Sequence, residues 1–114
     1  MPKSTECAKR LRIYIGEDDR WDGEPLYYAI VLKAKELDLA GATVFRGLVG
    51  FGAHSRIHEA TFLLSGDLPV LVEIIDSEEY INKMLPYLDQ MVQEGLVTID
   101  DIEIVKYGKT VRKR

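Results

Sequence analysis

The stretch Gly47-Leu48-Val49-Gly50-Phe51-Gly52-Ala53-His54-Ser55-Arg56-Ile57-His58 separates two strand-like runs and organises the fold that we expect for this chain. The first run extends from Ala42 to Val49 and the second from about Ile57 to Leu64, and both are rich in residues that favour β-strands. We expect them to pair as antiparallel strands around the glycine-containing segment. The middle of the chain then holds two consecutive strands with no helix between them.

The same segment is the strongest candidate for a ligand site. Gly50 and Gly52 have no Cβ, so the chain there can take positive φ values and turn its N–H groups toward an anion such as phosphate. His54, Arg56 and His58 add side-chain donors nearby. The spacing is not the dinucleotide-binding fingerprint, which would have to follow the first strand and open a helix. The alternative interpretation is a structural bend or β-bulge softened by glycine.

A strand and a helix precede this pair, and another strand follows it. Alternating apolar and polar residues over 11–15 predict a half-buried strand that ends at Gly16, and apolar residues at helical spacing predict an amphipathic helix from Pro25 to Gly41. The apolar run Val70–Ile75 predicts an inner strand, either buried on both faces or covered by helices on one.

The second helix follows this inner strand. Asp76 is the expected cap, with Glu79 three residues further on as in a capping box, and Pro86 should kink the helix or weaken its middle turn. Gly95 is expected to end it, and residues 97–107 supply the last strands.

The element order β-α-β-β-α-β predicts an α+β fold of the ferredoxin-like, split βαβ type, with two helices on one face of an antiparallel sheet. A length of 114 residues favours a single domain covering 1–114, and we expect flexible ends at 1–7 and 109–114. One face of such a sheet carries no helix and retains part of the apolar alternation. We therefore expect the chain to bury that face by self-association.

The composition excludes several classes of protein. It is 46% hydrophobic and 30% charged, as in ordinary globular proteins, and contains no apolar run that could span a bilayer. The amino terminus does not resemble a secretory signal, so we expect a cytoplasmic protein without membrane insertion. A net charge of −4 argues against nucleic-acid binding, although the tail Lys106–Arg114 is locally basic. The single cysteine, Cys7, is expected to be a passive thiol.

Several short motifs together resemble one family. With the expected element order they are similar to the PII-like "domain of unknown function 190" family and, more distantly, to the PII nitrogen-regulatory signalling proteins. The motifs are Pro25-Leu26-Tyr27, Ala40-Gly41-Ala42-Thr43-Val44, Arg46-Gly47, Gly50-Phe51-Gly52, Ile57-His58 and Asp67-Leu68-Pro69-Val70.

The resemblance implies a regulatory homotrimer rather than an enzyme. Gly50-Phe51-Gly52 matches the segment that opens the T-loop of PII proteins and contacts an adenine nucleotide between subunits. ADP or ATP is therefore the implied effector, with no required cofactor, and an unidentified protein is the implied regulated partner. The interval after Gly52 is shorter than a full T-loop and lacks its tyrosine, so the modification chemistry of PII proteins is not expected here.

The phosphate-binding loop of PII proteins is reduced here to residues 94–98, which include no lysine. Another cation would have to contact the phosphates, and Arg112 is one further candidate beyond the main set. The predicted ligand-binding residues are Arg46, Gly47, Gly50, Phe51, Gly52, His54, Arg56, His58, Lys106 and Lys109.

Two other functional classes stay open at this stage. A trimeric metal-ion-responsive protein of the ion-tolerance type would use His54 and His58, yet residues four apart lie about 13 Å from each other in an extended strand. A Mg²⁺ site at residues 17–19 competes with a simple solvated loop. Trp21 could stack on a ligand or pack over the core. A small ferredoxin-like enzyme would need a nucleophile–base pair, and Ser55 lacks one.

Overall fold

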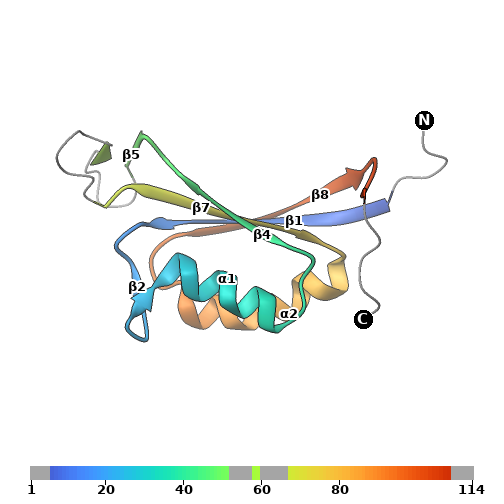
Figure 1. Cartoon of the computed structure of the whole chain (residues 1–114), viewed down its shortest axis with the longest axis horizontal. Coiled ribbons are helices and arrows are strands. Elements are labelled where there is room, and N and C mark those ends of the chain that lie inside the picture. The colour runs from blue at the N-terminus through green and yellow to red at the C-terminus, as the bar shows by residue number, and fades with distance from the viewer. Residues whose placement is uncertain (1–5, 52–57, 60–66, 109–114) are drawn as a thin grey trace.

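The computed structural model describes residues 6–51, 58–59 and 67–108 (Figure 1). Four strands form one antiparallel sheet in the order β4-β7-β1-β8, and both helices pack on the same face of it. This confirms the α+β, ferredoxin-like prediction. The elements are β1 (Glu6–Gly16), β2 (Arg20–Trp21), β3 (Glu24–Pro25), α1 (Leu26–Glu36), β4 (Ala42–Arg46), β5 (Val49–Gly50), β6 (His58–Glu59), β7 (Pro69–Asp76), α2 (Glu78–Met91) and β8 (Leu96–Ile104).

The core lies between the sheet and the helices. In the two central strands, alternate residues are buried toward the helices, as Ile13 of β1 and its register partner Val72 of β7 illustrate at 0% exposure. Ile30 of α1 and Ile81 of α2 close the layer from the other side and are also fully buried. Of the two possibilities for residues 70–75, the structure therefore adopts the inner strand covered by helices on one side.

The cap of α2 differs from the prediction. Ser77, not Asp76, is the N-cap, and its hydroxyl accepts a hydrogen bond from the Tyr80 N–H at 3.4 Å. Asp76 is the last residue of β7 and is 5% exposed, and its carboxylate accepts hydrogen bonds from the N–H groups of Ala40 and Ser77. Asp76 thereby links the end of β7 to the segment just before β4. An aspartate carboxylate readily accepts hydrogen bonds from nearby backbone N–H groups, so it need not cap the helix.

The other element boundaries shift modestly. Helix α1 ends at Glu36, before the expected Gly41, and α2 runs without a break through Pro86 to Met91, short of Gly95. The last strands form one continuous strand, β8, which ends before Tyr107. β1 begins at Glu6, inside the segment 1–7 for which we expected a flexible end.

The face of the sheet opposite the helices bears no described element (Figure 1). We call it the open face. Its side chains come from the alternate positions of the four strands, and several large apolar ones are exposed. Among these are Tyr14, Phe45 and Leu96.

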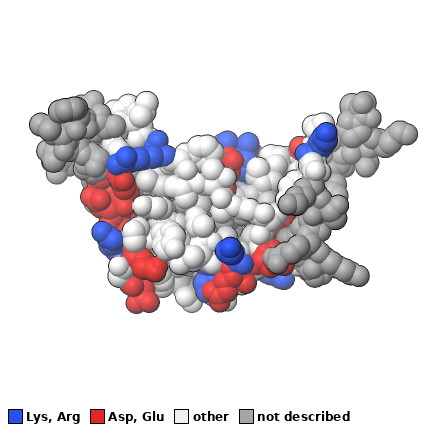
Figure 2. All heavy atoms as spheres, in the orientation of Figure 1, with Lys and Arg blue, Asp and Glu red and all other residues white. Residues whose placement is uncertain are grey.

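In the orientation of Figure 1, Figure 2 shows a broad uncharged area at the middle of the molecule, with acidic and basic groups around its margins. Within the described ranges, no helix is long and apolar enough to cross a membrane.

Candidate ligand site at the end of β4

The main chain leaves the sheet where β4 ends. Pairing of β4 with β7 stops at Arg46, opposite Val70, and the Gly47 N–H then donates to the Pro69 carbonyl at 2.7 Å. Two residues later β5 begins and pairs in antiparallel fashion with β6. We call the described residues of this projection, 47–51 and 58–59, the arm; it extends beyond the left end of the sheet in Figure 1. The predicted pairing of residues 42–49 with residues 57–64 is therefore found, among the described residues, only between β5 and β6, because residues 42–46 pair with β7 instead.

Pro69 explains two of the glycines in the arm. A Cβ added at Gly47 would lie 2.7 Å from Cγ of Pro69, and one added at Gly50 would lie 3.0 Å from the same atom. Neither glycine has a positive φ. The described glycines therefore serve a close approach between two backbone segments, and the conformational freedom suggested by the sequence is not what they provide. Gly52 lies outside the described residues.

Arg46 is held by an ion pair at the base of the arm. Its Nη2 is 2.9 Å from Oε2 and 3.1 Å from Oε1 of Glu17, which lies just after β1. The Arg46 side chain is 54% exposed and that of Glu17 is 24% exposed. A guanidinium that is half exposed and faced by one carboxylate can exchange that carboxylate for another anion.

The described part of the arm also exposes apolar side chains. Leu48 is 76% exposed, Val49 is 58% exposed and Phe51 is 69% exposed. Three neighbouring apolar residues at such exposure form a patch that a single chain leaves uncovered.

The remaining predicted site residues are scattered or not described. His58 belongs to β6 and pairs with Gly50, so the backbone brings these two positions together. Gly52, His54, Arg56, Lys109 and Arg112 lie outside the described residues.

Lys106 is exposed and lies just beyond β8, at the opposite end of the sheet from Arg46. The length of β1 between Glu6, opposite Ile104, and Ile15, opposite Val70, corresponds to about 30 Å. Lys106 and Arg46 of one chain therefore do not share a site. Lys106 instead lines a shallow hollow of about 750 Å³ together with Ile75, Ile102 and Tyr107.

The structure also bears on the other candidates. Trp21 of β2 is partly buried and packs against the core, which supports the packing interpretation over an exposed stacking platform. In the acidic loop, the Asp19 carboxylate accepts the Gly16 N–H at 3.0 Å, and the Asp18 N–H donates to the Asp67 carboxylate at 2.8 Å. Within the described residues, no group of three His, Cys, Asp or Glu side chains could hold a metal ion.

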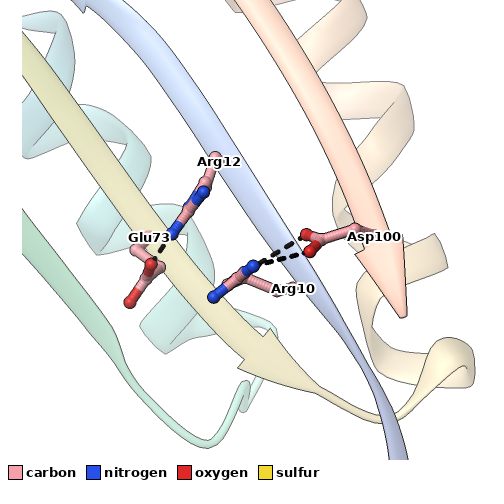
Figure 3. A network of polar contacts seen from close by, with 4 residues as sticks. All are labelled: Arg10, Arg12, Glu73 and Asp100. Carbon is pink, nitrogen blue, oxygen red and sulfur yellow. Dashed lines mark hydrogen bonds and ion pairs between the residues drawn. The ribbon is translucent and has the colours of Figure 1, made fainter. Parts of the chain in front are cut away.

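A polar network that the sequence did not predict occupies the centre of the open face (Figure 3). Arg10 of β1 contacts Asp100 of β8 through two hydrogen bonds of 2.6 and 3.2 Å, and Arg12 contacts Glu73 of β7 at 3.2 Å. The hydrogen bond from Arg10 holds the pKa of the Asp100 carboxyl below its usual value. The two pairs are neutral as a set, so this face has no net charge at its centre.

This geometry defines a class of protein: a ferredoxin-like, PII-like domain with an arm at the end of its second main strand. The chain belongs to the DUF190 family, described as "Uncharacterized ACR", whose family model matches residues 8–104. A UPF0166 protein of Aquifex aeolicus is 42% identical to it over 98 residues, covering 85% of this chain and 92% of that protein. The resemblance inferred from the sequence motifs is thereby confirmed.

Solved structures share the fold at lower identity. CPII of Thiomonas intermedia, bound to ADP and bicarbonate, matches with a TM-score of 0.66 at 18% identity, covering 90% of this chain and 93% of CPII. A putative PII-like signalling protein of Thermus thermophilus matches with a TM-score of 0.66 at 19% identity over 89% and 92% of the two chains. The divalent ion tolerance protein CutA1 of Ehrlichia chaffeensis matches with a TM-score of 0.54 at 10% identity over 89% and 84%.

Two contacts at the base of the arm were missed from the sequence. Glu17 was considered only with Asp18 and Asp19, as part of a Mg²⁺ site or of a solvated loop, and Pro69 only as part of a turn motif. Arg46 and Glu17 are 29 positions apart, and no periodic pattern links them. The motifs Arg46-Gly47 and Asp67-Leu68-Pro69 were the available signal, since both resemble the same family.

Proposed function

We propose that this chain is a PII-like regulatory protein that acts in the cytoplasm as a homotrimer, binds ADP or ATP in a cleft between subunits, and signals through the arm. The observation that carries the proposal is the construction of the arm: Gly47 and Gly50 pack against Pro69, beside a half-exposed arginine. An ordered hinge next to an anion-binding side chain suits a ligand whose phosphate biases one arm conformation. The fold likeness to CPII bound to ADP adds support.

The open face supports the trimeric part of the proposal. Tyr14 is 39% exposed, Phe45 48% and Leu96 57%, and the strand register places them in one row across the open face, next to the neutral pairs Arg12–Glu73 and Arg10–Asp100. Burying a face is favourable when its charges are already paired and its remaining surface is apolar. A second and third copy would cover these side chains. They would also bring the β8 end of one chain, with Lys106, toward the arm of another.

The distance between Arg46 and Lys106 within one chain fits this proposal. A nucleotide site that needs both residues must draw them from two chains, so no complete cleft is expected at the arm of a single chain. The hollow of about 750 Å³ lies at the Lys106 end instead.

Ligand-dependent thermal stability tests the proposal. ATP, ADP, AMP and divalent metal ions are each added to the purified protein, because a ligand that binds the folded state raises the melting temperature by mass action. We expect ADP or ATP to raise it and Gly52→Val to abolish the effect, with Cys7→Ala as the unaffected control. A melting temperature that no adenine nucleotide raises refutes nucleotide binding.

A metal-ion-responsive function is the second candidate, favoured by the fold shared with CutA1. The same titration separates the two, because stabilisation by a divalent metal alone, lost in a His54→Ala/His58→Ala variant, would support the metal function. Stabilisation by nucleotide without added metal would exclude metal sensing as the primary role.

A further inference from the structure

The ion pair between Arg46 and Glu17 lies at the boundary between the sheet and the arm. Arg46 is the last residue of β4, and the next residue, Gly47, makes the final hydrogen bond to β7 through its N–H and the Pro69 carbonyl. Glu17 follows directly after β1. The pair therefore links the loop after β1, across β7, to the end of β4, directly before the first residue of the arm.

Glu17 is held in place by its own backbone and by its neighbours. Its N–H donates to the Leu68 carbonyl at 2.8 Å, and the next N–H, of Asp18, donates to the Asp67 carboxylate. Gly16 donates to the Asp19 carboxylate on the other side. A carboxylate on a turn anchored at three consecutive residues is presented in a fixed place, so it costs little further conformational entropy to meet the arginine.

Both Glu17 oxygens contact Nη2 of Arg46, so a phosphate that approaches the guanidinium from this side would need the same nitrogen. Arginine binds carboxylates and phosphates through the same N–H groups, and it cannot serve both fully at one time. An exposed pair of this kind contributes little to folding stability, so a multiply charged ligand can displace it.

We propose that Glu17 is a specificity-determining residue that competes with the ligand for Arg46. In the free protein Glu17 holds Arg46 and, through it, the first residue of the arm; a bound phosphate replaces the Glu17 carboxylate and releases the turn at residues 16–19. Ligands without such a charge leave the pair in place. The inference rests on the proposed function in taking a nucleotide phosphate as the ligand group.

Affinity measurements on matched variants test the competition. Glu17→Gln removes the competing charge, and Asp18→Asn removes the same charge from the adjacent, exposed residue, which makes its hydrogen bond through the backbone N–H. By calorimetry, Glu17→Gln should bind ADP about three- to five-fold more tightly than the parent, the gain expected from losing an exposed pair. Adenosine affinity should be unchanged, and Asp18→Asn should resemble the parent. In an Arg46→Gln background, Glu17→Gln should give no further gain.

A measurement without nucleotide tests whether the Glu17–Arg46 pair restrains the first residue of the arm. Exchange of the Gly47 amide hydrogen reports opening of its bond to Pro69. Glu17→Gln and Arg46→Gln should each speed this exchange several-fold relative to Asp18→Asn.

The outcomes separate this inference from the proposed function. If ADP binds the parent and Glu17→Gln binds it no better than Asp18→Asn does, the competition is refuted and the proposed function stands. If Glu17→Gln binds ADP less tightly, Glu17 positions Arg46 and does not compete, which also refutes the inference. If no variant binds ADP, the proposed function fails. In that case the Gly47 exchange rates still test whether Glu17 restrains the arm through Arg46. Equal rates in Glu17→Gln and Asp18→Asn would refute that restraint, and faster exchange in Glu17→Gln would support it.

Discussion

Ile13 and Tyr14 are neighbours on β1, yet Ile13 is fully buried beneath the helices and Tyr14 is 39% exposed on the open face. The same contrast runs across the sheet: one face presents an almost purely apolar layer, and the other presents apolar side chains around two ion pairs. The covered face has its partners within the chain. The open face satisfies its charges but leaves its apolar groups uncovered, which is the pattern of a surface that a second molecule covers. β1 thus packs the core with one of its faces and presents the other to the proposed subunit interface.

The largest expected effect is the difference in folding stability lost by substitutions on the two faces of β1. Ile13→Ala should lower the free energy of unfolding by about 2–5 kcal/mol, because it leaves a cavity in a fully buried layer. Tyr14→Ala should lower it by less than about 1 kcal/mol when urea denaturation is extrapolated to low protein concentration. Equal losses for the two variants would mean that the open face supports the folding of the single chain.

The next effect concerns assembly. Phe45→Glu places a charge on the open face, where Phe45 lies opposite Leu71, and should convert the proposed trimer to monomer at micromolar concentration. Sedimentation measures the change, and circular dichroism should show an unchanged fold. Tyr28→Glu on α1 is the matched control, because Tyr28 is similarly exposed, at 50%, but lies on the helix side. A trimer that survives Phe45→Glu would exclude this part of the open face from the interface.

A smaller effect is expected at the arm. Gly50→Val brings a side chain against Pro69 and should weaken ADP binding about ten-fold through a cost of about 1–2 kcal/mol, while the trimer stays intact. Calorimetry on the folded variant checks this, with Cys7→Ala as an unaffected control. Unchanged affinity would show that the arm is a structural bend without a role in binding.

The smallest expected effect is on how the stability contributed by Asp100 depends on pH. Because the Asp100 pKa is lowered in the folded chain, its stabilising contribution is complete above the ordinary pKa of 3.8 and disappears as the pH falls through the lower folded pKa. Asp100→Asn should therefore be slightly less stable than the parent at neutral pH, and the difference should shrink as the solution is acidified below that ordinary pKa. Urea midpoints under both conditions measure it, and Asp89→Asn controls for loss of a charge. A difference that does not depend on pH would contradict the role given to the Arg10 hydrogen bond.

Much of the fold was predictable because the relevant signals are local. The alternation over 11–15 and the run 70–75 specify strands, and Pro25 marks the start of α1. The cap of α2 was missed because Asp76 and Ser77 are both good caps, and only the burial of Asp76 at the end of the inner strand β7 decides between them.

The candidate site was less predictable, since its parts meet only in three dimensions. Arg46 was identified as a candidate cation, but its pairing with Glu17 follows from where two strand ends lie in the sheet. Lys106 was placed in the same residue set as Arg46, and the register shows why one chain cannot bring them together.

The sheet has two different edges, and this difference has a consequence for newly made chains. Each edge strand offers unpaired backbone groups, which in an unassembled chain invite fibrous aggregation. β8 is long, but it carries the charged residues Asp100, Asp101 and Glu103, of which the first two form ion pairs with Arg10 and Lys9 of β1, while β4 is only five residues long and gives way to Gly47. Joining two β8 edges would bring these charged side chains together and disturb their ion pairs, and a β4 edge offers too short a template for extended pairing. Both edges therefore disfavour strand-to-strand polymerisation of single chains.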